Sequence, residues 1–125
     1  MIRPVAEYCA PVFHTLITAA DSNELERIQM QALKGIFSWR TSYKKLLEKS
    51  NLERLDVRRE TRFVELAKKM SDNARYATWF PLRLNRGNFR PRISERYKVY
   101  PSNTERYLKS PLNIMRQKLN DLYNE

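Results

Sequence analysis

The sequence predicts an all-α fold, a small helical bundle of four to five helices with a long irregular basic and aromatic segment before the C-terminal helix. Three observations predict it. Apolar residues recur at spacings of three and four in several stretches, which is the helical period. Prolines interrupt the region 74–110 without leaving a clear strand pattern. Hydrophobic residues make up 42% and charged residues 30% of 125 residues, which suits one small core with a heavily solvated surface.

The chain is accordingly expected to form one folding unit with three parts. These are a helical domain at 1–78, an irregular segment at 79–109 and a C-terminal amphipathic helix at 110–125. The first clear helix covers 21–39, with Asp21 or Ser22 as its N-cap. Its apolar positions form one broad face: Leu25, Ile28, Ala32, Leu33, Gly35, Ile36, Phe37 and Trp39. Gly35 is costly inside a helix, so we expect it to allow a close approach by another helix.

Two further helices follow before the irregular segment. A short one lies within 41–51, capped by Thr41 or Ser42, and buries Tyr43, Leu46 and Leu47. A longer one begins near Asp56 and runs to 72, burying Phe63, Leu66, Ala67 and Met70. Its opposite face carries a basic stripe of Arg58, Arg59, Arg62, Lys68 and Lys69. This stripe either contacts phosphates or is a solvated face, which is the commoner role of such residues.

The irregular segment is rich in cations and aromatic rings. They are Arg86, Phe89, Arg90, Arg92, Arg96, Tyr97, Lys98, Tyr100, Arg106, Tyr107 and Lys109. Such a mixture lets cations hold phosphates while rings stack on bases; the alternative is that the rings are buried and the charges point outward. Residues 96–99 alternate weakly like a strand. We expect Tyr107 to pack against the last helix, and Arg96, Lys98, Arg106 and Lys109 to face phosphate.

The last helix has clear start signals and one apolar stripe. Ser110 is a good N-cap and Pro111 suits the first helical position. Leu112, Met115, Leu119 and Leu122 then repeat at helical spacing. A stripe of this kind usually packs on its own chain, and a partner helix is the less common alternative.

The formal net charge of +10 directs attention to anionic partners. Residues 1–82 carry 14 basic and 10 acidic groups, and residues 83–125 carry 10 and 4. A field of this sign attracts nucleic acid first, and acidic membranes or proteins second. The whole set of candidate nucleic-acid-binding residues is Arg58, Arg59, Arg62, Arg90, Arg92, Arg96, Lys98, Arg106 and Lys109.

The sequence offers little for catalysis, metals or membranes. Cys9 is the only cysteine and His14 the only histidine, so no disulfide and no four-ligand Cys/His zinc site can form within one chain. The two are read as packing residues rather than a nucleophile and its base. There is no Gly-rich phosphate loop, and no apolar stretch approaches the roughly 20 residues that span a bilayer. We expect no catalytic residue, metal or cofactor, and neither a signal peptide nor a membrane anchor.

Several segments in order resemble the region after the polymerase core of non-LTR retrotransposon reverse transcriptases, especially jockey and CR1-like elements. They are "IRPVAEYCAPVFH", "LERIQMQALKGIF", "SYKKLLEKSNLERLDVRRETRFVELAKKM", "WFP" and "RYKVYPSNTERYLKSPLNIMRQKLN". The resemblance covers nearly the whole chain and rests on order and spacing. It departs from the family at Phe13, where tryptophan is more usual, and at Gly35.

The resemblance implies a thumb and post-thumb fragment of an RNA-directed DNA polymerase that supports template or target binding without chemistry. The paired aspartates of a polymerase have no counterpart, because no Asp-Asp pair occurs. The expected partners are RNA or DNA, bound non-specifically, and the remainder of a reverse transcriptase, with no membrane and no small-molecule substrate. The expected location is intracellular, in the nucleus or cytoplasm. The alternative is a helical protein-interaction or structural module that docks on a missing polymerase domain or another protein.

Overall fold

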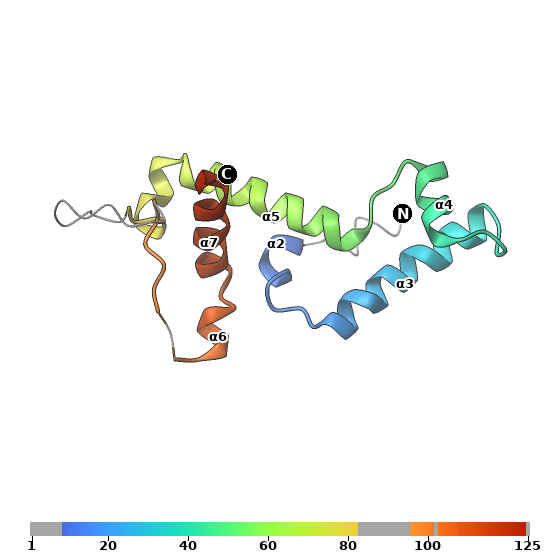
Figure 1. Cartoon of the computed structure of the whole chain (residues 1–125), viewed down its shortest axis with the longest axis horizontal. Coiled ribbons are helices and arrows are strands. Elements are labelled where there is room, and N and C mark those ends of the chain that lie inside the picture. Colours follow the sequence, from blue (N-terminus) through green and yellow to red (C-terminus); the bar gives the residue numbers. More distant parts are fainter. Residues whose placement is uncertain (1–8, 83–95, 102, 125) are drawn as a thin grey trace. The chain divides into compact units, whose positions relative to one another are not determined.

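The computed structural model describes residues 9–82, 96–101 and 103–124 of the chain, and it confirms the all-α class. In order, the elements are α2 (Ala10–Phe13), α3 (Ala19–Ile36), α4 (Tyr43–Ser50), α5 (Leu55–Ser71), the 3-10 helix η1 (Ala74–Trp79), α6 (Glu105–Leu108) and α7 (Pro111–Asn124) (Figure 1). The chain divides into two compact units, Met1–Arg62 and Phe63–Glu125, and the division falls inside α5. Each unit is described by itself.

In the first unit, α3 begins earlier than the sequence indicated. Thr18 is the N-cap, and its hydroxyl accepts a hydrogen bond from the Asp21 backbone N–H at 3.2 Å. The predicted caps Asp21 and Ser22 instead lie within the first helical turn. The start was misplaced because threonine caps a helix by the same chemistry as aspartate or serine.

The predicted apolar face of α3 is only partly buried: Leu33 is buried, and Leu25 and Ala32 are half-buried. Only Gln29 and Leu33 of this helix are buried. Large apolar side chains predicted for the face are exposed, namely Ile28, Ile36, Phe37 and Trp39. No described atom outside the helix's own backbone lies within 4 Å of where a Cβ on Gly35 would stand, so no close helix approach explains this glycine. The short helix α4 covers only some of the apolar residues of α3. Helical spacing shows which residues share a face, but it does not show which of them stay exposed to solvent.

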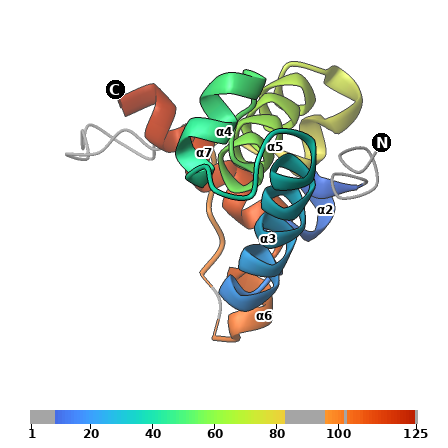
Figure 2. The same cartoon turned by 90° about the vertical axis from the view of Figure 1, so that its right-hand side faces the viewer.

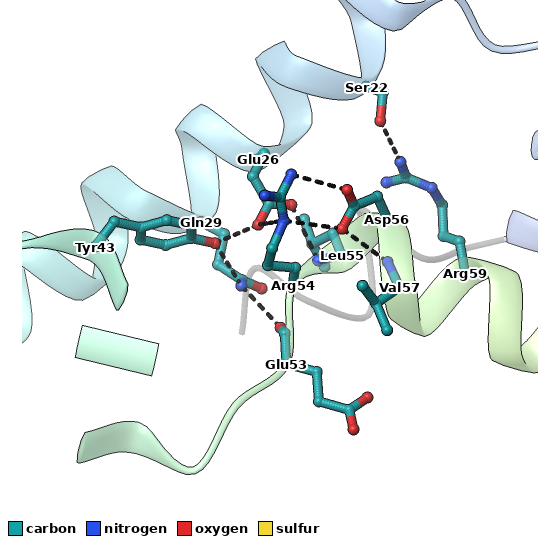
Figure 3. A network of polar contacts seen from close by, with 10 residues as sticks. All are labelled: Ser22, Glu26, Gln29, Tyr43, Glu53, Arg54, Leu55, Asp56, Val57 and Arg59. Atoms are coloured by element: carbon teal, nitrogen blue, oxygen red, sulfur yellow. Dashed lines mark hydrogen bonds and ion pairs between the residues drawn. The ribbon is translucent and has the colours of Figure 1, made fainter. Parts of the chain in front are cut away.

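A polar network joins α3 to α4 and to the start of α5 (Figure 3). Glu26 accepts hydrogen bonds from the Tyr43 hydroxyl and, at 3.0 Å, from the backbone N–H of Leu55. Leu55 is the first residue of α5, so this carboxylate satisfies one of the N–H groups that a helix start leaves without an internal partner. Figures 1 and 2 show α4 beside the C-terminal end of α3, where this network holds it.

Gln29 completes the network from the buried side of α3. Its amide Nε2 donates to the Tyr43 hydroxyl at 3.0 Å and to the Glu53 carbonyl at 3.2 Å. Burial, followed by the hydrogen bond to Glu26, raises the pKa of the Tyr43 phenol well above its ordinary value. The first unit therefore combines this polar network with the buried side chains of Leu33, Leu46 and Leu55.

The second unit has an apolar core that matches the predicted faces of α5 and α7. Its buried members are Phe63, Ala67, Phe80, Tyr97, Met115 and Leu119. Leu66, Met70 and Leu112 pack against them as predicted, whereas Leu122 is 38% exposed. The stripe of α7 thus packs on its own chain, which is the commoner of the two alternatives. No helix within the described ranges is long and apolar enough to cross a membrane.

Candidate nucleic-acid interface

The candidate interface is built on an extended segment, Arg96–Tyr100, in the second unit. Asn120 of α7 holds it by two hydrogen bonds to one residue. The Asn120 Oδ1 accepts from the Tyr97 backbone N–H at 2.8 Å, and its Nδ2 donates to the Tyr97 carbonyl at 3.0 Å. On the other side, the Lys98 backbone N–H donates to the Pro81 carbonyl at 3.0 Å.

An isolated antiparallel bridge between Leu82 and Tyr97 fixes the register of this segment. Successive side chains of an extended chain point to opposite sides. Tyr97 points into the core, where it is 4% exposed and meets the Phe80 ring edge-on at 6.0 Å between centroids. Burial raises the pKa of its phenol. The weak strand pattern at 96–99 is therefore realised as a single bridge, and Arg96 and Lys98 lie on the exposed side.

Each exposed cation of the segment rests over an aromatic ring. The Arg96 guanidinium lies 4.5 Å from the centroid of the Tyr123 ring and 5.9 Å from that of Tyr97. The Lys98 ammonium lies 4.9 Å from the centroid of the Tyr100 ring. Each such contact stabilises an exposed site by roughly 0.5 to 1 kcal/mol. The rings thus orient both positive charges while leaving them accessible to solvent.

Arg116 supports the segment from α7. It is buried, and its Nε and Nη2 donate to the Trp79 carbonyl at 2.9 and 2.6 Å. Its guanidinium also lies 5.0 Å from the centroid of the Tyr100 ring, on which Lys98 rests as well. Two cations therefore share one ring, and no carboxylate pairs with Arg116 among the residues that the structure describes. Arg116 thus adds a buried positive charge next to that of Lys98.

A small hollow opens beside the segment. It has a volume of about 290 Å³ and is lined by Lys68, Ser71, Asp72, Leu119, Leu122 and Tyr123. Tyr123 is half exposed and borders both the hollow and the Arg96 guanidinium. A planar group entering here would meet the Tyr123 ring, with Lys68 and Asp72 also in the lining of the hollow.

The second Glu-Arg-Tyr copy, at 105–107, behaves differently from the first. Arg106 and Lys109 are exposed, as predicted, and the Lys109 ammonium lies 3.7 Å from a carboxylate oxygen of Glu105. Tyr107 is 43% exposed and lies outside the buried core. Its packing against the last helix stays a prediction. Tyr97, in the first copy, is buried, because the bridge to Leu82 and the Asn120 hydrogen bonds turn it inward.

The predicted basic stripe of α5 is only partly on the surface. Arg62 is exposed and Arg58 is half-buried. Arg59 is 2% exposed, and its Nη2 donates to the Ser22 hydroxyl at 2.5 Å, so it is not available to a phosphate in this structure. Its partner Ser22 belongs to α3, which lies far from Arg59 in the sequence. Arg90 and Arg92 lie outside the described residues.

The sequence reasoning missed the polar side of α7. Asn113, Arg116 and Asn120 are buried there at the same spacings of three and four that mark the apolar stripe. Polar residues that repeat at helical spacing next to an apolar stripe can indicate buried positions as well. Asn120 and Arg116 are the two residues that position the interface.

The described ranges hold no cluster of side chains that suits a metal ion. No group of three or more His, Cys, Asp or Glu side chains there could hold a metal ion. His14 Nε2 lies 2.6 Å from a Glu60 carboxylate oxygen, which ties α5 to the segment after α2. Cys9 is exposed. The chemistry of the interface is therefore that of positive charge and aromatic rings.

Comparisons with protein-family models, with curated proteins and with solved structures found no match for this chain.

Proposed function

We propose that this chain is a non-catalytic part of a retrotransposon reverse transcriptase that binds RNA or DNA through the exposed side of Arg96–Tyr100. The proposal combines the sequence resemblance with one structural observation. Arg96 and Lys98 share the exposed side of a held extended segment, and each rests on a tyrosine ring. The binding is electrostatic and does not read base sequence.

The geometry suits a phosphate backbone better than a single small anion. Two residues on the same side of an extended chain are separated by about 6.6 Å, at roughly 3.3 Å per residue. Charges spaced in this way can contact different phosphates of one strand. Because Asn120 and the aromatic rings hold the segment before binding, little side-chain entropy is lost when the phosphates arrive.

A salt titration tests the proposal. The affinity of the chain for a fluorescent oligonucleotide is measured at several salt concentrations, with the double variant Arg96→Ala, Lys98→Ala beside the unmodified protein. Each lost contact should reduce the logarithmic salt slope by about 0.7 for single strands, or about 0.9 for duplex. We expect a reduction of about 1.4 for the double variant with a single strand. Adding Arg106→Ala and Lys109→Ala should flatten the slope further.

The matched control removes two charges from the first unit. Arg27 is exposed and pairs with Glu24, and Lys49 is exposed near the end of α4. The variant Arg27→Ala, Lys49→Ala has the same net charge as the Arg96, Lys98 variant and should keep the original slope. Equal slopes for the two variants would show that only net charge matters and would contradict the assigned interface. An unmodified chain that binds neither single-stranded nor duplex nucleic acid at low salt would refute the function and favour a protein-interaction module.

A further inference from the structure

The turn between α3 and α4 carries an exposed apolar cluster. We call Ile36, Phe37 and Trp39 the Trp39 cluster; their exposed fractions are 74%, 46% and 70%. The three residues lie at the end of α3 and directly after it, next to Gly35 with its open surroundings. Large apolar side chains gathered on a protein surface indicate an interaction site.

Four cations lie near this cluster in the sequence. Lys34, Arg40, Lys44 and Lys45, which we call the cationic rim, lie within residues 34–45, a stretch that contains no Asp or Glu. In the part of the chain that the structure describes, none of the four forms an ion pair. Nearby cations behave differently, because Arg27 pairs with Glu24 and Arg54 with Asp56. Within the described residues, no carboxylate therefore neutralises the positive charge of the rim.

We infer that the Trp39 cluster and its cationic rim form a second nucleic-acid site, specific for single strands. The Trp39 and Phe37 rings would stack on unpaired bases while the rim contacts phosphates. This is the combination by which sequence-tolerant single-strand sites work. A duplex keeps its bases stacked on one another, so it can use the rim but not the rings.

Two other occupants fit the observations less well. A second copy of this chain would bring two cationic rims together, and like charges at close range oppose association. A membrane-surface helix needs a long continuous apolar face. Here the Trp39 cluster occupies only the helix end and the turn, where the polar residues Ser38 and Thr41 interrupt the apolar surface. The site rests on the proposed function only in taking the same class of ligand, since it uses other residues in the other unit.

Trp39 fluorescence offers a direct test. The chain has two tryptophans, so the full-length variant Trp79→Phe leaves Trp39 as the only one. Titration with an oligo(dT) of about 16 nucleotides at low salt should quench its emission, and added salt should reverse the quenching. Matched duplex should quench much less. In the Arg96→Ala, Lys98→Ala background, a Trp39→Ala change should weaken oligo(dT) binding by about 5- to 100-fold, given the usual contribution of one stacked base.

Two control variants sharpen the result. Trp39→Phe keeps a ring and should retain most of the affinity that Trp39→Ala loses. Ile28→Ala removes another exposed apolar residue of α3, away from the turn, and should leave binding unchanged. Equal losses for Trp39→Ala and Ile28→Ala would overturn the inference, because a general loss of α3 structure would then explain both.

The remaining outcomes separate this site from the one at Arg96–Tyr100. Oligo(dT) binding without any change in Trp39 emission refutes the second site and leaves the proposed function standing. In the Arg96→Ala, Lys98→Ala variant, Trp39 quenching that is the same as in the unmodified chain supports the second site. If the salt slope of oligonucleotide binding is also unchanged in this variant, the first site is refuted. A blue shift of Trp39 emission with anionic phosphatidylserine vesicles, without a response to oligo(dT), overturns the inference in favour of a membrane. A molecular mass that doubles with protein concentration overturns it in favour of a second copy.

Discussion

Replacing Asn120 with alanine should release the Arg96–Tyr100 segment from α7. The Asn120 side chain makes two hydrogen bonds, one to the N–H and one to the carbonyl of Tyr97, at 2.8 and 3.0 Å. Both partners are buried. The variant therefore removes two bonds and also leaves two buried backbone groups without a partner.

The size of the effect follows from that count. A buried group left without its hydrogen bond costs about 1 to 3 kcal/mol, so two cost roughly 2 to 6 kcal/mol, with some relief as water enters. We expect a loss of about 3 kcal/mol in the free energy of unfolding of the second unit. A unit of its size is stable by only roughly 3 to 9 kcal/mol, so the variant should be close to unfolding.

Urea unfolding measures this loss unit by unit. In a Trp39→Phe background the only tryptophan is Trp79, which reports on the second unit. The matched control is Asn124→Ala, which removes an exposed amide that donates to the Asn120 carbonyl. It should cost less than about 1 kcal/mol. A loss of under about 1 kcal/mol for Asn120→Ala, or equal losses for both variants, would refute the assigned role of Asn120.

Three further changes test other parts of the structure. Gly35→Ala should raise the free energy of unfolding by up to about 1 kcal/mol, because the helix gains a better former in open space; a lower melting temperature would contradict this. Arg59→Met should leave urea stability unchanged or raise it by about 1 kcal/mol, since the buried guanidinium has a hydroxyl but no carboxylate partner within the described residues; a loss above about 2 kcal/mol would contradict this. The raised phenol pKa of Tyr43 stabilises the first unit below the ordinary tyrosine pKa of about 10, and this contribution should be lost as pH rises above that value. Tyr43→Phe should make the unfolding free energy less dependent on pH between about 9 and 11, and an unchanged dependence would count against the network.

The sequence predicted best the helices whose apolar residues pack against one another in a core. The faces of α5 and α7 in the second unit belong to this class, since Phe63, Ala67, Met115 and Leu119 all reach the core. On α3 the same periodic pattern was misleading. Helical spacing tells which residues share a face, but the depth of burial depends on what lies opposite, and α4 is only eight residues long.

The burial of some polar residues was also not predicted from the sequence. Arg59 and Asn120 were read as surface residues or passed over, because charged and amide side chains are usually exposed. Their burial depends on partners distant in the sequence, Ser22 for one and the Tyr97 backbone for the other. No local pattern identifies such a partner. The candidate interface could therefore be predicted as a basic, aromatic stretch, but not as a segment held by α7.

The bridge at Tyr97 also bears on how the protein avoids aggregation. An extended segment has two edges of backbone N–H and carbonyl groups, and an uncovered edge can recruit a strand from another molecule. Here the 81–82 stretch bonds one edge at Lys98, and the Asn120 amide, which offers a donor and an acceptor like a peptide group, closes the other at Tyr97. A helix side chain thus takes the place of a neighbouring strand. Loss of Asn120 would open that edge and make the chain prone to intermolecular β-pairing, even under conditions in which most of it stays folded.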